Sequence, residues 1–221
     1  LQYNFALHFP DQLLYHPDRA GRAGGLYNGP DTSPLVEGCS FVDNTASIGA
    51  AMVNWHSNTT VKNCRFIDNK AQGSALGGGI DNLRCTARFT NCLFSGNSAK
   101  KGGAMTLREG NVTLVNCTLS GNSAYRGGGI YDTQSELTVT NCIVWGNTSG
   151  GSIYLEDTPP PQVTFSNIQG GWEGEGNIDA DPRFADVYND DYRLLPDSPC
   201  INAGDPAYVP AFGEKDIDGE A

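Results

Sequence analysis

The sequence predicts an all-β solenoid, a single-stranded parallel β-helix with about 25 residues per coil and an irregular C-terminal cap. Three observations favour this fold. Five cysteines recur at intervals of 25, 28, 25 and 25 residues, an asparagine follows each by five positions, and a cluster of small residues lies between them. Repeats of about 20 to 50 residues are typical of solenoids, whose units bury their apolar sides by stacking on their neighbours. The repeated residues are Cys39, Cys64, Cys92, Cys117 and Cys142, with Asn44, Asn69, Asn97, Asn122 and Asn147.

The repeat divides the chain into three parts. Residues 1–20 match it poorly and are predicted to form an irregular segment or a partial coil. Residues 21–168 carry the repeats and form the β-helix. Residues 169–221 contain no repeat unit, and we expect them to cover the last coil, because natural β-helices protect the unpaired strand edges at their ends.

Within each coil, apolar residues three positions before and two positions after the cysteine are the expected inward positions of short strands. The alternation breaks at the residue between them, which is Asn63, Asn91, Asn116 or Asn141. Asparagine tolerates the left-handed backbone region, so this position predicts a corner. The column from Asn44 to Asn147 is predicted to stack at a second corner, giving about three strands per coil. A three-residue insertion is expected on a loop at Gln72–Leu76.

The cysteines are predicted to remain thiols. Equivalent residues on successive coils lie about 4.8 Å apart, whereas a relaxed disulfide needs Cβ atoms about 3.8 Å apart. We therefore expect the five-cysteine column to be buried packing. Cys85 and Cys200 lie off it; Cys85 is expected to be exposed, and a bridge between these two is an open alternative. No C-x-x-C spacing is present, so zinc is not expected.

Several segments carry a resemblance to a known group of proteins. The units CRFIDNKAQGSALGGGI, CLFSGNSAKKGGAM and CTLSGNSAYRGGGI resemble the F-x-x-N and G-G-A-[ILV] repeats of chlamydial polymorphic outer-membrane proteins, and of bacterial right-handed parallel β-helix surface proteins more broadly. The tail NIQGGWEGEGNIDADPRF, with DYRLLPDSPCINAGDP, is similar to the closing module of secreted, variably anchored β-helix proteins. The resemblance implies a right-handed coil and a secreted or cell-surface location. Because those proteins continue beyond the D-x-D-G segment, we expect this chain to be a fragment, a processed form or an atypical member.

Parallel β-helices also include polysaccharide lyases and glycoside hydrolases of the pectate-lyase type, so an enzyme is the alternative function. Such a site needs a base beside a cation, or a pair of acids. The candidates are the charged residues that follow the aliphatic landmark on neighbouring coils, Asp81, Arg84, Arg108 and Asp132. We expect them to share one sheet face, but no acid recurs at the same position of two coils, and this favours ordinary surface pairs over catalysis.

Aromatic residues on the same strands indicate a binding surface. Tyr27, Tyr131 and Tyr154 all follow the landmark aliphatic directly, and Trp55 lies nearby. Tyr131 and Tyr154 are predicted to lie on adjacent coils and to point outward. Exposed aromatic rings on a flat sheet can stack on sugars or contact a protein, so these four residues are the candidate glycan- or partner-binding site.

Charge and composition limit the remaining possibilities. The net charge is −11 and no basic stripe is present, which disfavours nucleic acid as a partner, and no apolar run is long enough to span a membrane. No cofactor is expected in the solvated acidic tail; a structural calcium ion is the alternative, with Asp179, Asp181, Asp216 and Asp218 as its candidate ligands. We therefore predict a non-catalytic, extracellular structural or adhesive module, with end-to-end association into a homo-oligomer or fibre as a further hypothesis.

Overall fold

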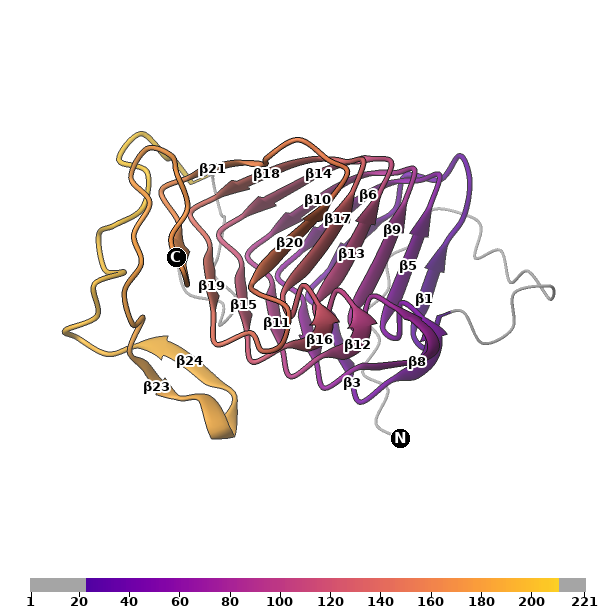
Figure 1. Ribbon diagram of the computed structural model, residues 1–221, viewed down its shortest axis with the longest axis horizontal. Helices are drawn as coiled ribbons and strands as arrows, with labels where there is room; N and C mark the ends of the chain where they lie inside the picture. Colours follow the sequence, from indigo (N-terminus) through magenta and orange to yellow (C-terminus); the bar gives the residue numbers. More distant parts are fainter. Residues whose placement is uncertain (1–22, 211–221) are drawn as a thin grey trace.

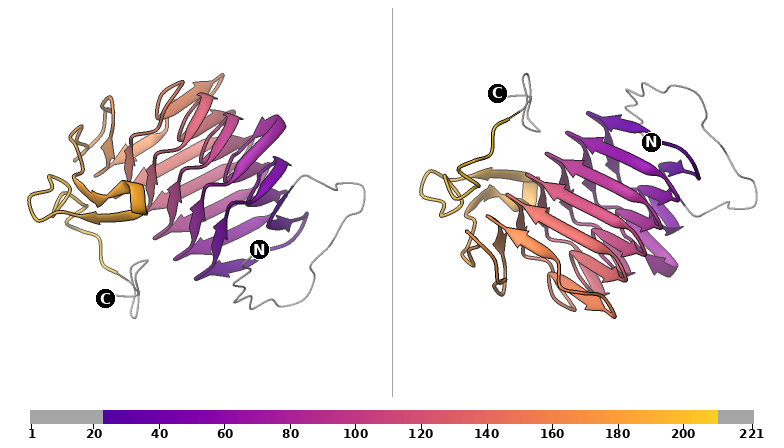
Figure 2. Two further views of the ribbon diagram at one scale, coloured as in Figure 1. Left: turned by 90° about the horizontal axis from the view of Figure 1, so that it is seen from below. Right: turned by 90° about the horizontal axis from the view of Figure 1, so that it is seen from above.

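The computed structural model describes residues 23–210, apart from the side chains of Ser74 and Ala75. Parallel strands stack into successive coils, and a C-terminal segment lies across one end of the stack (Figures 1 and 2). The predicted parallel β-helix is therefore confirmed. The N-terminal segment 1–20 lies outside the described residues.

Three six-stranded parallel sheets run along the stack. Sheet A contains β1 (Leu26–Asn28), β5 (Met52–Trp55), β9 (Ile80–Leu83), β13 (Met105–Arg108), β17 (Ile130–Thr133) and β20 (Ile153–Glu156). Sheet B contains β2 (Leu35–Glu37), β6 (Asn58–Lys62), β10 (Thr86–Thr90), β14 (Asn111–Val115), β18 (Glu136–Thr140) and β21 (Gln162–Thr164). Sheet C contains β3 (Ser40–Val42), β7 (Arg65–Ile67), β11 (Leu93–Ser95), β15 (Thr118–Ser120), β19 (Ile143–Trp145) and β22 (Asn167–Ile168).

A fourth, shorter sheet corrects the expected three strands per coil. Sheet D contains β4 (Thr45–Ile48), β8 (Lys70–Leu76), β12 (Ser98–Lys101) and β16 (Ser123–Arg126). The predicted insertion lies within β8, so it is not on a separate loop. The strand has seven residues where its neighbours have four, and its pairing shifts register on both sides. The extra residues are accommodated as a bulge because the flanking coils keep their own pairing.

The tail covers part of the last coil, as predicted. The Phe165 N–H donates to the Glu175 carbonyl at 2.7 Å, and Ile178 pairs with Ser166 and Ile168. These bonds cover the ends of β21 and β22. The tail continues into a hairpin of β23 (Phe184–Asp186) and β24 (Asp191–Leu194), which are joined by the 3-10 helix η2 (Val187–Asn189). Asp190 in this hairpin accepts a hydrogen bond from the Ser95 hydroxyl of the coil at 2.8 Å.

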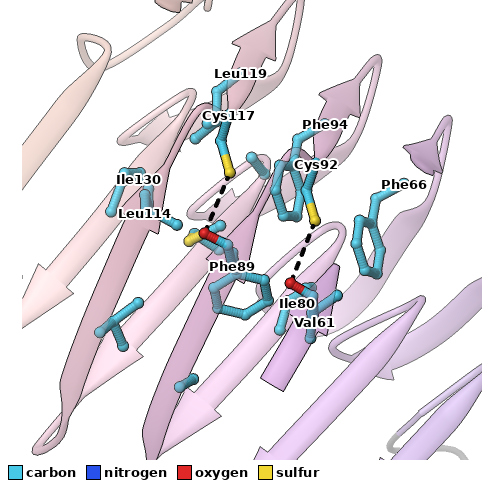
Figure 3. Close-up of a cluster of buried hydrophobic side chains, with 14 of the residues drawn as sticks. Val61, Phe66, Ile80, Phe89, Cys92, Phe94, Leu114, Cys117, Leu119 and Ile130 are labelled. Atoms are coloured by element: carbon cyan, nitrogen blue, oxygen red, sulfur yellow. Dashed lines mark hydrogen bonds between the residues drawn. The ribbon is translucent and has the colours of Figure 1, made fainter. Parts of the chain in front are cut away.

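The core consists of columns of inward side chains, one residue from each coil. Phe41, Phe66 and Phe94 stack with their rings nearly parallel and their centroids 5.0 and 4.7 Å apart. The next coils place Leu119, Val144 and Ile168 in the same column. Figure 3 shows Phe66, Phe94 and Leu119 of this column facing a second column, which includes Phe89 and Leu114. The coil interior is therefore apolar along its length, and the burial of this apolar surface stabilises the stack.

The cysteine column is buried as predicted, and all five thiols are free. Each S–H donates to the carbonyl two residues earlier, at 3.1–3.3 Å. Some also lie near a carbonyl of the preceding coil, as Cys92 does with Val61 at 3.8 Å (Figure 3). In the last coil Ser166 takes the place of the cysteine and accepts the N–H of Cys142 at 3.0 Å. The column therefore provides hydrogen bonds to the backbone at the same corner of successive coils.

Both predicted corners are confirmed. Asn63, Asn91, Asn116 and Asn141 have φ angles of 50–54°, in the left-handed region. At the second corner, the side chains of Asn44, Asn69, Asn97, Asn122 and Asn147 form a continuous ladder in which each amide donates to the next amide oxygen at 2.8–2.9 Å. Each oxygen also accepts the backbone N–H of the preceding ladder residue. The ladder thus satisfies backbone groups where the strands end.

The prediction for Cys85 was wrong, because its side chain is buried. Arg84 adopts a left-handed conformation, and the following residue turns back into the coil, where its thiol lies 3.7 Å from the Asn82 amide oxygen. Cys200 lies instead at the last coil, where its sulfur accepts a bond from Asn167 at 3.0 Å. Both cysteines are free, so the structure does not contain the alternative bridge between them.

The buried thiols are expected to be chemically inert in the folded protein. Burial keeps reagents away from all six of these thiols, and it raises the pKa of Cys64 and of Cys85 to about 12, so that these two carry no thiolate at neutral pH. With Ellman's reagent at neutral pH, we expect only the half-buried Cys200 to react rapidly, and the other six thiols to react after unfolding in denaturant. Rapid modification of more than one thiol in the native protein would contradict this prediction.

Candidate functional site on the outer face of sheet A

The outer face of sheet A carries six of the eight residues predicted as catalytic or binding candidates. Its strands present two outward columns that follow the coil axis. The first contains Tyr27, Val53, Asp81, Thr106, Tyr131 and Tyr154. The second contains Trp55, Leu83, Arg108, Thr133 and Glu156. We call this surface face A.

Tyr131 and Tyr154 lie on adjacent coils, as their spacing predicted, and their rings stack on each other. The rings of Tyr131 and Tyr154 are 5.8 Å apart at their centroids and 10° from parallel. However, Tyr131 is only 2% exposed, which corrects the expectation of an open aromatic surface. Lys101 covers its ring at 4.4 Å, and Arg126 lies over Tyr154 at 5.4 Å. Two cationic side chains at the ends of β12 and β16 in sheet D therefore pack on the tyrosine rings, in cation–π contacts that stabilise both partners.

Glu156 links these cations into one network. Its carboxylate accepts hydrogen bonds from Tyr131 and Arg126, and from Lys101 at 3.3 Å. Lys101 also donates to the Tyr131 hydroxyl at 2.7 Å. The bond from Tyr131, with the two cations, lowers the pKa of Glu156. Burial is the main cause of the raised Tyr131 pKa. The network therefore keeps Glu156 ionised and Tyr131 neutral at physiological pH.

Asp81 and Arg108 form a second pair in the middle of face A. The guanidinium of Arg108 binds the carboxylate of Asp81 with two bonds, at 2.6 and 3.2 Å. The Thr106 hydroxyl donates to the same carboxylate at 2.5 Å. The Asp81 side chain is buried and that of Arg108 is 24% exposed. Both carboxylate oxygens of Asp81 thus accept hydrogen bonds from neighbours within the protein, as in a structural ion pair.

The remaining enzyme candidates do not join this pair. Arg84 binds Glu109 at 2.9 Å on an exposed turn. Asp132 is on the opposite side of its strand, since its register partners Leu107 and Leu155 continue the inward column, and it is fully buried. The expectation that all four candidates share one face is therefore wrong for two of them: Arg84 lies on the turn after β9, and Asp132 lies inside the coil. The reason is that Asp132 is two residues after the landmark aliphatic, while Asp81 is one residue after it, and adjacent strand residues point to opposite sides.

The other candidate binding residues are separated from the tyrosine stack. Tyr27 lies on β1, where three coils carrying Val53, Asp81 and Thr106 stand between it and Tyr131. Trp55 is partly buried and makes an edge contact with His56 at a centroid distance of 5.0 Å. The structure therefore brings together two of the four predicted aromatic residues.

In the acidic tail, Asp179 and Asp181 accept backbone N–H groups of Gly170 and Arg183, at 3.2 and 2.9 Å. Asp216 and Asp218 lie outside the described residues. Within residues 23–210, no group of three or more His, Cys, Asp or Glu side chains is arranged to hold a metal ion. The two described carboxylates serve as turn acceptors.

Two functional features were missed by sequence reasoning. Lys101 and Arg126 directly precede the glycine cluster on neighbouring coils, which is a signal that the sequence did contain. A second, interior asparagine ladder joins Asn28, Asn54 and Asn82 at 2.7 and 2.8 Å. Its residues are two positions after Leu26, Met52 and Ile80, so the repeat could have placed them, although an isolated asparagine there does not predict burial.

These coils define the class of protein, a parallel β-helix. Residues 74–174 match the family model described as the right handed beta helix region, which extends from β8 to the start of the tail and supports a right-handed coil. No curated protein and no solved structure shows a significant match to the chain. None of the described helices is long and apolar enough to cross a membrane.

Proposed function

We propose that this protein is an extracellular, non-catalytic β-helix module that acts as a rigid scaffold and uses face A to contact a glycan or protein partner. The observation that carries this proposal is the pairing of the charged side chains across face A. A lyase or hydrolase needs an acid or base that is free to reach the substrate. On face A, Asp81 binds Arg108 and Glu156 binds two cations, and on the adjoining turns Arg84 binds Glu109.

The enzyme alternative makes a different prediction for polysaccharide substrates. Purified protein is incubated with pectin, alginate and chondroitin, and we measure unsaturated products by ultraviolet absorbance and new reducing ends by a colour assay. We expect no product above a buffer control, with or without added calcium. Product formation that disappears in Asp81→Asn and Arg108→Ala, while both variants remain folded, would establish the enzyme and overturn the proposal.

A binding role depends on Tyr154, the more exposed of the two stacked tyrosines. Tyr154 is half-buried, and the side chains of Arg126 and Glu156 beside it are 37% and 34% exposed. A ring edge flanked by charged hydrogen-bonding groups suits sugar hydroxyls or a polar protein surface. On a glycan array and in pull-downs with cell-surface extracts, we expect Tyr154→Ala to weaken binding about fivefold, because an aromatic contact contributes on the order of 1 kcal/mol.

The matched control is Tyr125→Ala, which removes an exposed tyrosine from β16 in sheet D, outside face A. Binding that falls equally in both variants would mean that face A is not the contact surface. If no glycan or surface protein binds at all, the adhesive part of the proposal is rejected and the scaffold part remains.

A further inference from the structure

We propose that Asp132 is a proton-binding site inside the coil, and that it makes the β-helix more stable in mildly acidic than in neutral solution. This inference concerns the coil interior and does not depend on the proposed function.

The geometry of Asp132 sets it apart from the other described carboxylates. The residue is 0% exposed, and within the described residues neither carboxylate oxygen has a hydrogen-bond partner of good geometry, although the hydroxyl and N–H of Ser135 lie close enough to offset part of the cost of ionisation. Asp81, the other buried acid, is bound by a threonine and an arginine. Such a carboxylate is costly when it is ionised, because it loses its hydration and gains only the partial compensation of Ser135 in exchange. The protonated form avoids most of that cost.

The same inward column shows how polar groups are satisfied elsewhere. Two coils below Asp132, Asn82 accepts the amide of Asn54 at 2.8 Å, and Asn54 also accepts the Thr59 hydroxyl at 3.1 Å. Leu107 then interrupts the column between Asn82 and Asp132, and Leu155 follows on the next coil. Asp132 therefore lies between two leucines, out of reach of the interior ladder.

Among residues 23–210, no charged side chain compensates for Asp132. The charged residues on the strands packed against it, Arg108 on β13, Glu156 on β20 and Glu136 on β18, point away from the interior. Ser135 of the same coil approaches the Asp132 carboxylate, and its hydroxyl also lies 3.5 Å from the Thr133 carbonyl. A calcium ion needs about six to eight oxygen ligands, which two leucines and a serine do not supply. A proton is therefore the cation that fits this position.

The direction of the pH effect follows from burial. Burial raises the pKa of Asp132 from 3.8 to about 6, partly offset by Ser135, and no charged group contributes to the shift. Between these two values, the folded state holds a proton that the unfolded chain has released. The stability due to this group is therefore fully present below the unfolded value and is lost as the pH rises through about 6.

The test compares urea unfolding at about pH 5 and about pH 7.5, between which we expect the Asp132 carboxyl to change the unfolding equilibrium constant about tenfold. When the pH is lowered from about 7.5 to about 5, the unfolding equilibrium of the wild type should shift about tenfold toward the folded state relative to that of Asp132→Asn. The reason is that the asparagine side chain cannot titrate. Asp132→Leu copies the leucines of the neighbouring coils and should also lose the dependence. Asp68, whose pKa is also raised, is present in all these proteins and cancels in the comparison.

Two further measurements keep the test decisive. Asp81→Asn removes the other buried acid and should retain the pH dependence due to Asp132. If the Asp132 variants fail to fold, carbon-13 NMR of the wild type reports the titration directly, and the Asp132 carboxyl signal should move with a midpoint near pH 6. The inference is overturned if Asp132→Asn keeps the full wild-type pH dependence, or if this carboxyl titrates at its ordinary value.

Discussion

Replacing Asn97 by leucine is expected to lower the free energy of unfolding by about 4 kcal/mol, since it leaves two buried backbone groups without partners at about 1–3 kcal/mol each. The Asn97 side chain accepts the N–H of Asn69 at 3.0 Å and donates to the carbonyl of Phe66 at 2.8 Å. It also joins its neighbours in the ladder. Leucine has a similar size but can form none of these bonds. Urea unfolding followed by circular dichroism measures the loss.

The control is the same substitution at the end of the ladder. Asn44 is half-buried, and its side chain donates one ladder bond, to Asn69 at 2.8 Å. We expect Asn44→Leu to cost about 1 kcal/mol, because water can replace that bond. Equal losses at the two positions would show that the ladder bonds do not account for the stability of this corner.

Replacing Phe66 by alanine is expected to cost about 3–5 kcal/mol, because it removes the central ring of the three-phenylalanine stack and leaves a cavity. Phe66 is fully buried and contacts Phe41 on one side and Phe94 on the other. Strands of the adjacent coils are fixed by their hydrogen bonds, so the coil cannot collapse to fill the space. The same urea titration provides the measurement.

Phe66→Leu tests whether the ring or the apolar volume matters. Leu119 already occupies the equivalent inward position on a later coil, so leucine fits the backbone there. We expect a loss of about 1 kcal/mol, well below that of the alanine variant. If both variants lose the same amount, the cavity is not the source of the destabilisation.

The repeat allowed most of the fold to be predicted from sequence, because the same spacing of inward and corner residues recurs in five successive repeats. The cysteine column, the asparagine ladder and the corner before each cysteine were all placed correctly. The candidate site was predicted less well. Tyr131 and Tyr154 were placed on adjacent coils, as the structure has them. The cations that cover them, Lys101 and Arg126, come from sheet D, which the sequence analysis did not predict.

The sequence by itself determined the coil, since a fixed spacing of inward residues can be buried only by stacking equivalent positions. The tertiary structure decided which charged side chains form ion pairs and which do not. Asp81 and Asp132 are both acids just after the landmark aliphatic, yet one binds Arg108 outside the coil and the other lies unpaired within it. The physical reason is the alternation of the strand, by which a shift of one residue moves a side chain from the surface to the core.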